Sequence, residues 1–249
     1  KRQVFYILKN VLKIRHLQKI NIMKKTFIKV AAILFLTTLT SCGVDMLNRI
    51  EGNNNVTSIK RDINTDFTKV RVSTGIELII QQGSEISLTV EADENLHDII
   101  ITEVVDGKLK IYTEKNIWKS AAKRVYLTVN TIEELTASSG STVISESVLK
   151  ANNLDVSSSS GANLTIEVAA TNLISSTSSG SSLNLSGETT SHETSASSGS
   201  SITAYKLISK DVIAKVSSGA SISVYVSSSI DGKASSGGGI SFEGNPEKI

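Results

Sequence analysis

Residues 159–166 read Ser-Ser-Gly-Ala-Asn-Leu-Thr-Ile, and this pattern of a Ser-Ser-Gly triplet followed by alternating apolar residues recurs through the second half of the chain. The six triplets end at Gly140, Gly161, Gly180, Gly199, Gly219 and Gly237, at intervals of 21, 19, 19, 20 and 18 residues. A period near 20 residues indicates one supersecondary unit that must stack on its neighbours to bury its apolar side.

The apolar residues keep a fixed distance from each glycine. The third residue after glycine is aliphatic in every repeat: Val143, Leu164, Leu183, Ile202, Ile222 and Ile240. Alternation by two on either side of the glycine is strand periodicity. The sequence therefore predicts an all-β fold, a single-stranded parallel β-helix of about 20-residue coils, in which these six side chains form one buried column.

The Ser-Ser-Gly triplets are expected to be the corners of the coils. Glycine adopts backbone angles that other residues avoid, and serine bonds nearby backbone groups or the serine one coil away, which would give a hydroxyl ladder. A disordered Ser/Gly linker is the alternative interpretation. The fixed aliphatic phase after every glycine argues against it, because a linker has no reason to keep that phase.

The region before the repeats is rich in strands but less regular. Asp106-Gly107 separates two alternating segments, residues 99–105 and 109–113, which predicts a β-hairpin. Residues 72–78, with Gly75, look like a degenerate corner. We interpret residues 56–134 as irregular first coils or an end cap of a domain that spans residues 56–246, preceded by a flexible, lipidated tether at residues 42–55.

The chain also carries an export signal. Residues 23–42 combine a basic start, a short apolar run and the sequence Leu-Thr-Ser-Cys, which resembles a bacterial lipobox. We expect residues 23–41 to be a signal peptide, cleaved between Ser41 and Cys42, with lipid attached to Cys42. An ordinary signal peptide with a chance cysteine is the alternative. Residues 1–22 are interpreted as an upstream extension outside the mature protein.

Charge limits the partners of the mature chain. Residues 1–42 hold nine Lys or Arg and no Asp or Glu, so that 17 basic and 24 acidic residues follow Cys42, a net charge of −7. Such a domain should repel phosphate backbones, which excludes nucleic acid as an expected partner. The single cysteine excludes an intrachain disulfide and a Cys-cluster metal site.

Three stretches before the repeats carry further information. Residues 67–83 read Phe-Thr-Lys-Val-Arg-Val-Ser-Thr-Gly-Ile-Glu-Leu-Ile-Ile-Gln-Gln-Gly, residues 88–96 read Leu-Thr-Val-Glu-Ala-Asp-Glu-Asn-Leu, and residues 106–111 read Asp-Gly-Lys-Leu-Lys-Ile. These stretches resemble the head GIN domain family, a family of adhesin-like domains (DUF2807) frequent among Bacteroidetes lipoproteins. The Ser-Ser-Gly corners and the closing Phe-Glu-Gly-Asn-Pro of residues 242–246 fit the same family. The resemblance covers residues 59–246 and implies a right-handed β-helix with an adhesin role; it supplies no catalytic residues.

No residue set has the spacing of a catalytic or metal site. His97 and His192 are expected to face solvent. Asp93, Glu94 and Asp98 beside His97 could cup a cation, although an acidic, solvated turn explains them as well. We expect neither cofactor nor bound metal.

The acids of the repeats are scattered, and Asp155 and Glu193 are interpreted as lying at different offsets from their glycines, so that they need not share a face. The sequence therefore predicts a non-enzymatic, lipid-anchored protein of the cell envelope, in the outer membrane, that displays the solenoid for adhesion or surface interaction. A glycan-active β-helix enzyme and a purely structural envelope lipoprotein remain the alternatives. A glycan or a protein surface could be the ligand, and self-association stays open. Trp118 would either anchor a partner or plug the solenoid end.

Overall fold

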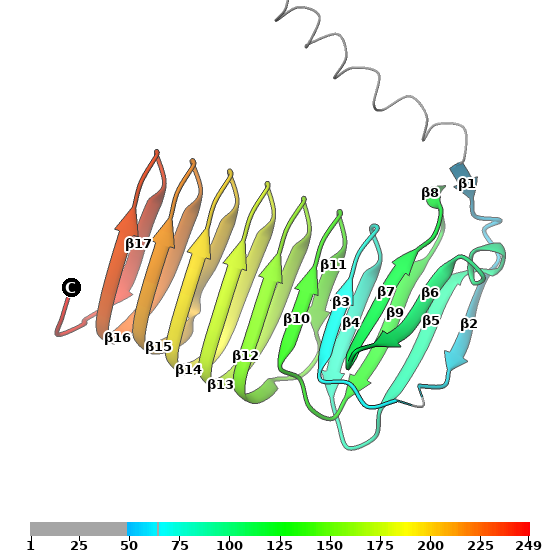
Figure 1. Cartoon of the computed structure of the whole chain (residues 1–249), viewed down its shortest axis with the longest axis horizontal. Coiled ribbons are helices and arrows are strands. Elements are labelled where there is room, and N and C mark those ends of the chain that lie inside the picture. Colours follow the sequence, from blue (N-terminus) through cyan, green and yellow to red (C-terminus); the bar gives the residue numbers. More distant parts are fainter. Residues whose placement is uncertain (1–48, 64) are drawn as a thin grey trace, which may run out of the picture. The chain divides into compact units, whose positions relative to one another are not determined.

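The structure, a computed structural model, describes residues 49–249 except residue 64. It is built almost entirely from strands, and its long axis follows a stack of parallel coils (Figure 1). The coils contain β10 (Glu134–Ala137), β11 (Thr142–Ser145), β12 (Leu149–Ser158), β13 (Asn163–Thr177), β14 (Ser182–Ala196), β15 (Ser201–Val216), β16 (Ser221–Ala234) and β17 (Gly239–Gly244). The predicted β-solenoid with repeats of about 20 residues is confirmed.

Each full coil is one long strand that bends in the middle and so contributes to two sheets. In β13, residues 163–165 pair with β11, and residues 172–177 pair with the second halves of β12 and β14. We call the layer that follows each corner the first sheet and the layer that precedes the next corner the second sheet. Side chains alternate between buried and exposed in both halves, so the core lies between the two layers.

The six aliphatic residues after the corner glycines occupy one register. Leu164 pairs with Val143 and Leu183, and the column continues through Ile202 and Ile222 to Ile240. The first five are at most 1% exposed, and Ile240 is partly buried because no further coil covers it completely. Fully burying each such side chain stabilises the fold by about 1.5–3 kcal/mol.

The corners are tight turns in which two consecutive residues have positive φ. Ser160 and Gly161 have φ values of 51° and 72°, and the same pair of angles recurs at every Ser-Ser-Gly corner and at Thr74-Gly75. The glycine N–H of each corner donates to the serine carbonyl of the next coil at 2.9–3.1 Å. The ladder that joins the corners is therefore made by the backbone, and the hydroxyls of Ser141, Ser181 and Ser200, just after the glycines, bond corner carbonyls.

The N-terminal part supplies the first coil and a cap. β3 (Lys69–Val72) and β4 (Glu77–Gln82) flank the Thr74-Gly75 corner and pair in parallel with β10 and β11. The strands of the cap are β2 (Val56–Arg61), β5 (Ser87–Asp93), β6 (Ile100–Val105), β7 (Lys108–Thr113) and β9 (Lys123–Val129). β9 and β7 continue the two sheets in parallel, whereas β2, β5 and β6 are antiparallel to their neighbours. The predicted Asp106-Gly107 hairpin joins β6 to β7.

Two short elements complete the cap. β1 (Arg49–Glu51) pairs with β8 (Asn116–Lys119), and a 3-10 turn, η2 (Glu94–Leu96), buries Leu96. Residues 50–55, which we expected to be part of a flexible tether, are instead bonded to the domain. The Gly52 N–H donates to the Lys119 carbonyl at 2.8 Å, and the Asn54 N–H donates to Asp93 at 3.0 Å. These backbone bonds fix the segment against the cap.

Candidate interaction surfaces

The outer face of the second sheet carries a column of charged and aliphatic residues. All of them stand six positions before a corner glycine, and their registers join them in one line along the solenoid: Glu134, Asp155, Ile174, Glu193, Ile213 and Asp231. We call this line the outer column. The interpretation that Asp155 and Glu193 lie at different offsets is wrong, because both stand six positions before a glycine. Both point outward, with Ile174 between them.

The carboxylates of the outer column lie in different electrostatic surroundings. Glu134 accepts a hydrogen bond from the Lys108 ammonium at 2.6 Å. Burial alone would raise the pKa of Glu134, but the contact with Lys108 holds this pKa below its usual value. Partial burial and repulsion by Glu134 raise the pKa of Asp155. Glu193 forms an ion pair with Lys215 at 3.0 Å. The column thus mixes ion-paired acids with a carboxylate, Asp155, whose pKa is raised.

Two isoleucines interrupt the acids. Ile174 is 47% exposed and Ile213 is 44% exposed, although both belong to coils that bury their inward aliphatic residues. Protein interaction surfaces typically combine exposed aliphatic side chains with charged residues around them. Contact with a partner would bury the two isoleucines and leave the charged residues at the rim. This pair was not predicted from the sequence, although both residues stand six positions before a corner glycine.

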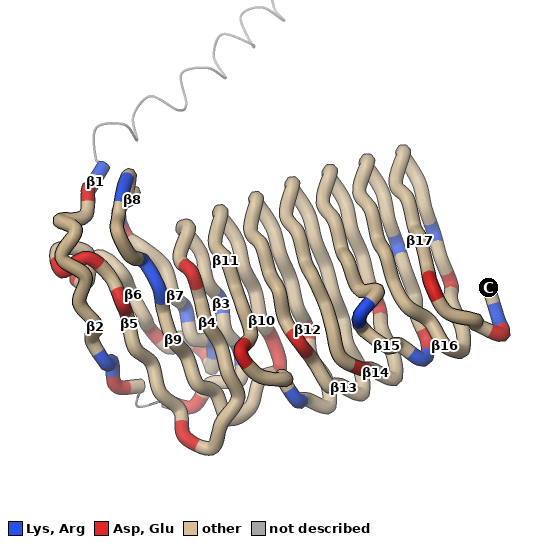
Figure 2. The backbone as a smooth tube through the Cα atoms, turned by 180° about the vertical axis from the view of Figure 1, so that it is seen from behind, with Lys and Arg blue, Asp and Glu red and all other residues tan. Residues whose placement is uncertain are grey.

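The outer face of the first sheet is different, because most of its side chains are uncharged and polar, with Ile144, Glu167 and Glu243 as exposed exceptions. Neighbouring coils are joined by side-chain hydrogen bonds, as between Ser182 and Asn163 at 2.6 Å and between Ser223 and Ser241 at 3.1 Å. Figure 2 shows that the corner edge of the coils is also free of charge. These side chains already satisfy one another across the coils.

Both histidines of the described chain are buried, so the expectation that they face solvent is wrong. His192 is 1% exposed because it stands seven before Gly199, in the inward column that holds Leu173 and Val212 in the adjacent coils. Its Nε2 lies 2.9 Å from the Ser175 hydroxyl, which donates to the Thr194 hydroxyl at 2.8 Å. Burial lowers the pKa of His192 to about 4.

The residues around His97 do not converge on a cation. His97 is 6% exposed, and its Nε2 lies 3.0 Å from the Thr57 hydroxyl. Asp93 is fully buried and accepts the backbone N–H groups of Asn54, Ala121 and Ala122. These bonds lower the pKa of Asp93 although burial opposes them. The Asp93 carboxylate therefore joins residue 54 and residues 121–122 to its own strand, β5. The described residues contain no group of three or more His, Cys, Asp or Glu side chains that could hold a metal ion.

Trp118 lies on β8 and is 59% exposed. It therefore does not plug the solenoid end. Ser41 and Cys42, with the signal peptide, lie outside the described residues. Within residues 49–249, leaving out residue 64, no helix is long and apolar enough to cross a membrane.

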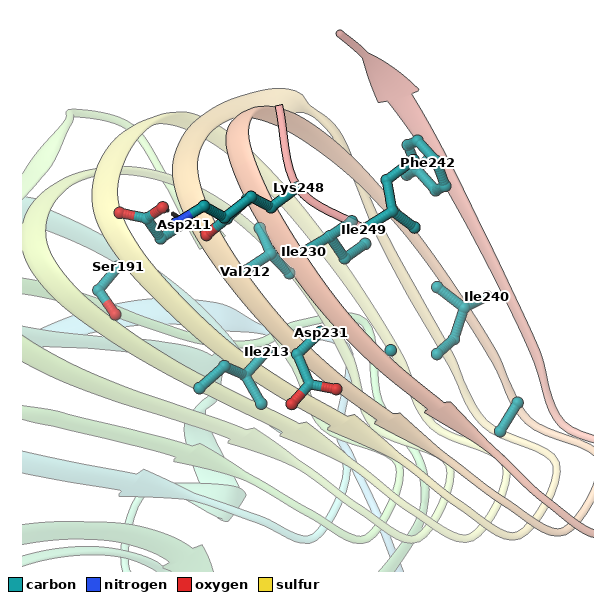
Figure 3. Close-up of a pocket in the computed structure, with 13 residues that line it drawn as sticks. Ser191, Asp211, Val212, Ile213, Ile230, Asp231, Ile240, Phe242, Lys248 and Ile249 are labelled. Carbon is teal, nitrogen blue, oxygen red and sulfur yellow. Dashed lines mark hydrogen bonds between the residues drawn. The ribbon is translucent and has the colours of Figure 1, made fainter. Parts of the chain in front are cut away.

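A recess opens at the C-terminal end of the solenoid (Figure 3). It has a volume of about 720 Å³ and an apolar part that includes Ile230, Ile240, Phe242 and Ile249. Asp211 and Asp231 lie on its charged side with Lys248. The hydroxyl of Ser229 donates to Asp211 at 2.6 Å, and this bond lowers the pKa of Asp211. The recess therefore combines an apolar interior with an ionised rim.

A family model described as "Putative auto-transporter adhesin, head GIN domain" matches residues 66–246. The chain belongs to this family. The resemblance noted in the sequence is thereby confirmed over residues 66–246. No curated protein matches the chain.

Solved structures share the fold of this head GIN domain. A "putative adhesin" from Bacteroides fragilis superposes with a TM-score of 0.69 at 18% identity, covering 80% of this chain and 100% of that one. A "putative lipid binding protein" from Parabacteroides distasonis gives 0.62 at 19% identity, with 81% and 99% covered. A "putative adhesin" from Parabacteroides merdae gives 0.58 at 18% identity, with the same coverage. At these identities the likeness establishes the fold.

Proposed function

We propose that this head GIN domain is a non-enzymatic adhesin module that binds a protein or glycan surface through the outer column. The observation that carries the proposal is the exposure of Ile174 and Ile213 between carboxylates on a flat, regular sheet face. Stacked coils hold such a face rigid, so little conformational entropy is lost when it binds. The family and the neighbouring folds described as adhesins support the same function.

The carboxylates support binding in preference to hydrolysis. A glycosidase needs a protonated general acid and an ionised partner on either side of the scissile bond. Asp155 and Glu193 are two coils apart, about 9.6 Å along the stack, but Ile174 fills the space between them and Glu193 is paired with Lys215. In the recess, the pKa of Asp211 is lowered, which is opposite to what a general acid requires.

We also propose that the module is tethered to the cell envelope, at the outer membrane, by lipid on Cys42. The lipobox at residues 39–42 and the basic, apolar segment before it support this anchor. Lipid attachment at the N-terminus would leave the coils of residues 134–244 free to contact a ligand.

A Cys42→Ser variant is expected to lose lipid label and to leave the membrane fraction, because the thiol is the only acceptor of the diacylglyceryl group. The measurement is labelled-fatty-acid incorporation together with fractionation of expressing bacteria. Wild-type levels of label and of membrane-bound protein in the variant would contradict the anchor.

Binding and turnover can be separated with one panel of matrix proteins and polysaccharides. We expect saturable binding to at least one panel member and no new reducing ends or unsaturated sugars after prolonged incubation with calcium present. Turnover that disappears on Asp155→Asn or Glu193→Gln substitution would instead establish a glycan-active enzyme. Absence of any binding would leave a purely structural envelope protein.

A further inference from the structure

The second sheet ends in an open strand edge at the C-terminal coil. Residues 231–234 of β16 have register partners in β15 but none on the side that faces the recess. β17 continues only the first sheet, where it pairs with residues 221–226. An open edge of this kind is a template for the backbone of another strand.

The C-terminal segment shows how a strand sits on this edge. Lys248 forms a parallel bridge with Ser229, and its carbonyl accepts the Ile230 N–H at 3.0 Å. In a parallel ladder the groups that face one side alternate along the strand, so the N–H groups of Gly232 and Ala234 face the same open side as that of Ile230. Residues 231–234 therefore offer the same backbone bonds to a further strand, and no described residue occupies that position.

The inner side of the vacant position is apolar. Gly232 and Ala234 are in register with the buried Ala214 and Val216, so they point inward. Across the recess, Phe242 is in register with the fully buried Val224, yet it is 40% exposed because no strand covers it. A large apolar side chain placed beside Gly232 would fill this space and cover Phe242, which Figure 3 shows beside the recess.

The outer side of the vacant position carries two opposite charges. Asp231 and Lys233 are both exposed and point outward, in register with Ile213 and Lys215 of the preceding coil. Lys233 thus stands beside a like charge, and Asp231 stands beside an aliphatic residue. A strand in the recess would place one residue next to Asp231 and, two positions later, another next to Lys233.

We propose that this recess binds an extended peptide segment of a partner protein, which adds to β16 as a parallel strand. The segment has a basic residue beside Asp231, a large apolar residue beside Gly232 and an acidic residue beside Lys233. Main-chain hydrogen bonds to the edge hold it, and the charges fix its register and direction, as in other cases of recognition by strand addition. This site adjoins the proposed contact surface, because Ile213 and Asp231 of the outer column line the recess, whereas Ile174 lies outside it.

Two synthetic peptides test the site: Lys-Leu-Glu-Val-Thr-amide, which matches the charges, and Glu-Leu-Lys-Val-Thr-amide, which reverses them. Each begins beside Asp231, because Ile249 already lies beside Ile230. Fluorescence anisotropy with labelled peptides should show the matched peptide binding the intact protein about tenfold more tightly, because two favourable pairs replace two like-charge pairs. Equal affinity for the two peptides, or no binding of either, would overturn the proposal.

Two variants locate the binding. The double substitution Asp231→Lys and Lys233→Glu should reverse the preference between the peptides, and Gly232→Pro should abolish binding of both because it removes an edge donor. Melting temperatures near that of the wild type check that the variants are folded. A preference that survives the charge reversal contradicts the assigned register. Ile174→Lys leaves the recess unchanged, so peptide binding by that variant separates this site from the proposed adhesive face.

Discussion

Replacing Leu183 by Asp is expected to destabilise the solenoid by about 4–5 kcal/mol, enough to unfold a typical domain of this size under mild conditions. Leu183 is fully buried between Leu164 and Ile202 in the column that follows the corner glycines. A carboxylate there would have neither water nor a cation to compensate for its charge. The loss should be seen in urea unfolding followed by far-UV circular dichroism.

Asn184→Asp is the matched control for this substitution. Asn184 is the next residue along β14 and points outward, so its replacement adds the same charge at a solvent-exposed position. We expect the control to unfold within about 0.5 kcal/mol of the wild type. A Leu183→Asp protein as stable as this control would contradict the assignment of Leu183 to the core.

Acid is expected to destabilise the protein through His192, by about 3 kcal/mol between pH 7 and pH 4. The unfolded chain binds a proton at His192 below the ordinary pKa of 6.5, whereas burial lowers the pKa in the fold to about 4. Between these values the unfolded state holds more protons. Stability must therefore fall as the pH falls from 6.5 to 4.

The substitution His192→Leu isolates this contribution, because leucine occupies the equivalent position one coil away, at Leu173. The variant should retain the acid dependence of the carboxylates but lose the part due to His192. The measurement is the difference in unfolding free energy between the two proteins at pH 7 and at pH 4.5. A difference that is the same at both values would mean that His192 is protonated equally in the folded and unfolded states.

The repeat predicted the solenoid well because its information is local. Every coil repeats a corner glycine such as Gly161 and an aliphatic residue three positions later. The position of the glycines in the sequence therefore reveals both the corners and the buried column. The cap was less predictable. β9 lies between β4 and β5 although it begins 30 or more residues after either strand ends, and alternation within a strand does not identify its neighbours.

The same phase contained more information about the surfaces than the sequence analysis used. Counting six positions back from the glycines places Asp155, Ile174 and Glu193 in one line, and counting seven back places His192 inside the core. The recess could not be found in this way. It depends on where the last register partner of β16 ends, and Phe242 has the same sequence phase as its buried counterpart Val224.

The most direct test of the adhesive account compares two charged variants for binding to the ligand identified in the panel. Ile174→Lys with Ile213→Lys alters the outer column, and Thr165→Lys with Thr203→Lys adds the same charge to the opposite, first-sheet face. Surface plasmon resonance should show at least a tenfold loss of affinity for the isoleucine variant, because each buried aliphatic contact contributes about 1 kcal/mol or more, and little change for the threonine variant. Equal affinity of the isoleucine variant and the wild type would contradict the assignment of the adhesive surface to the second sheet.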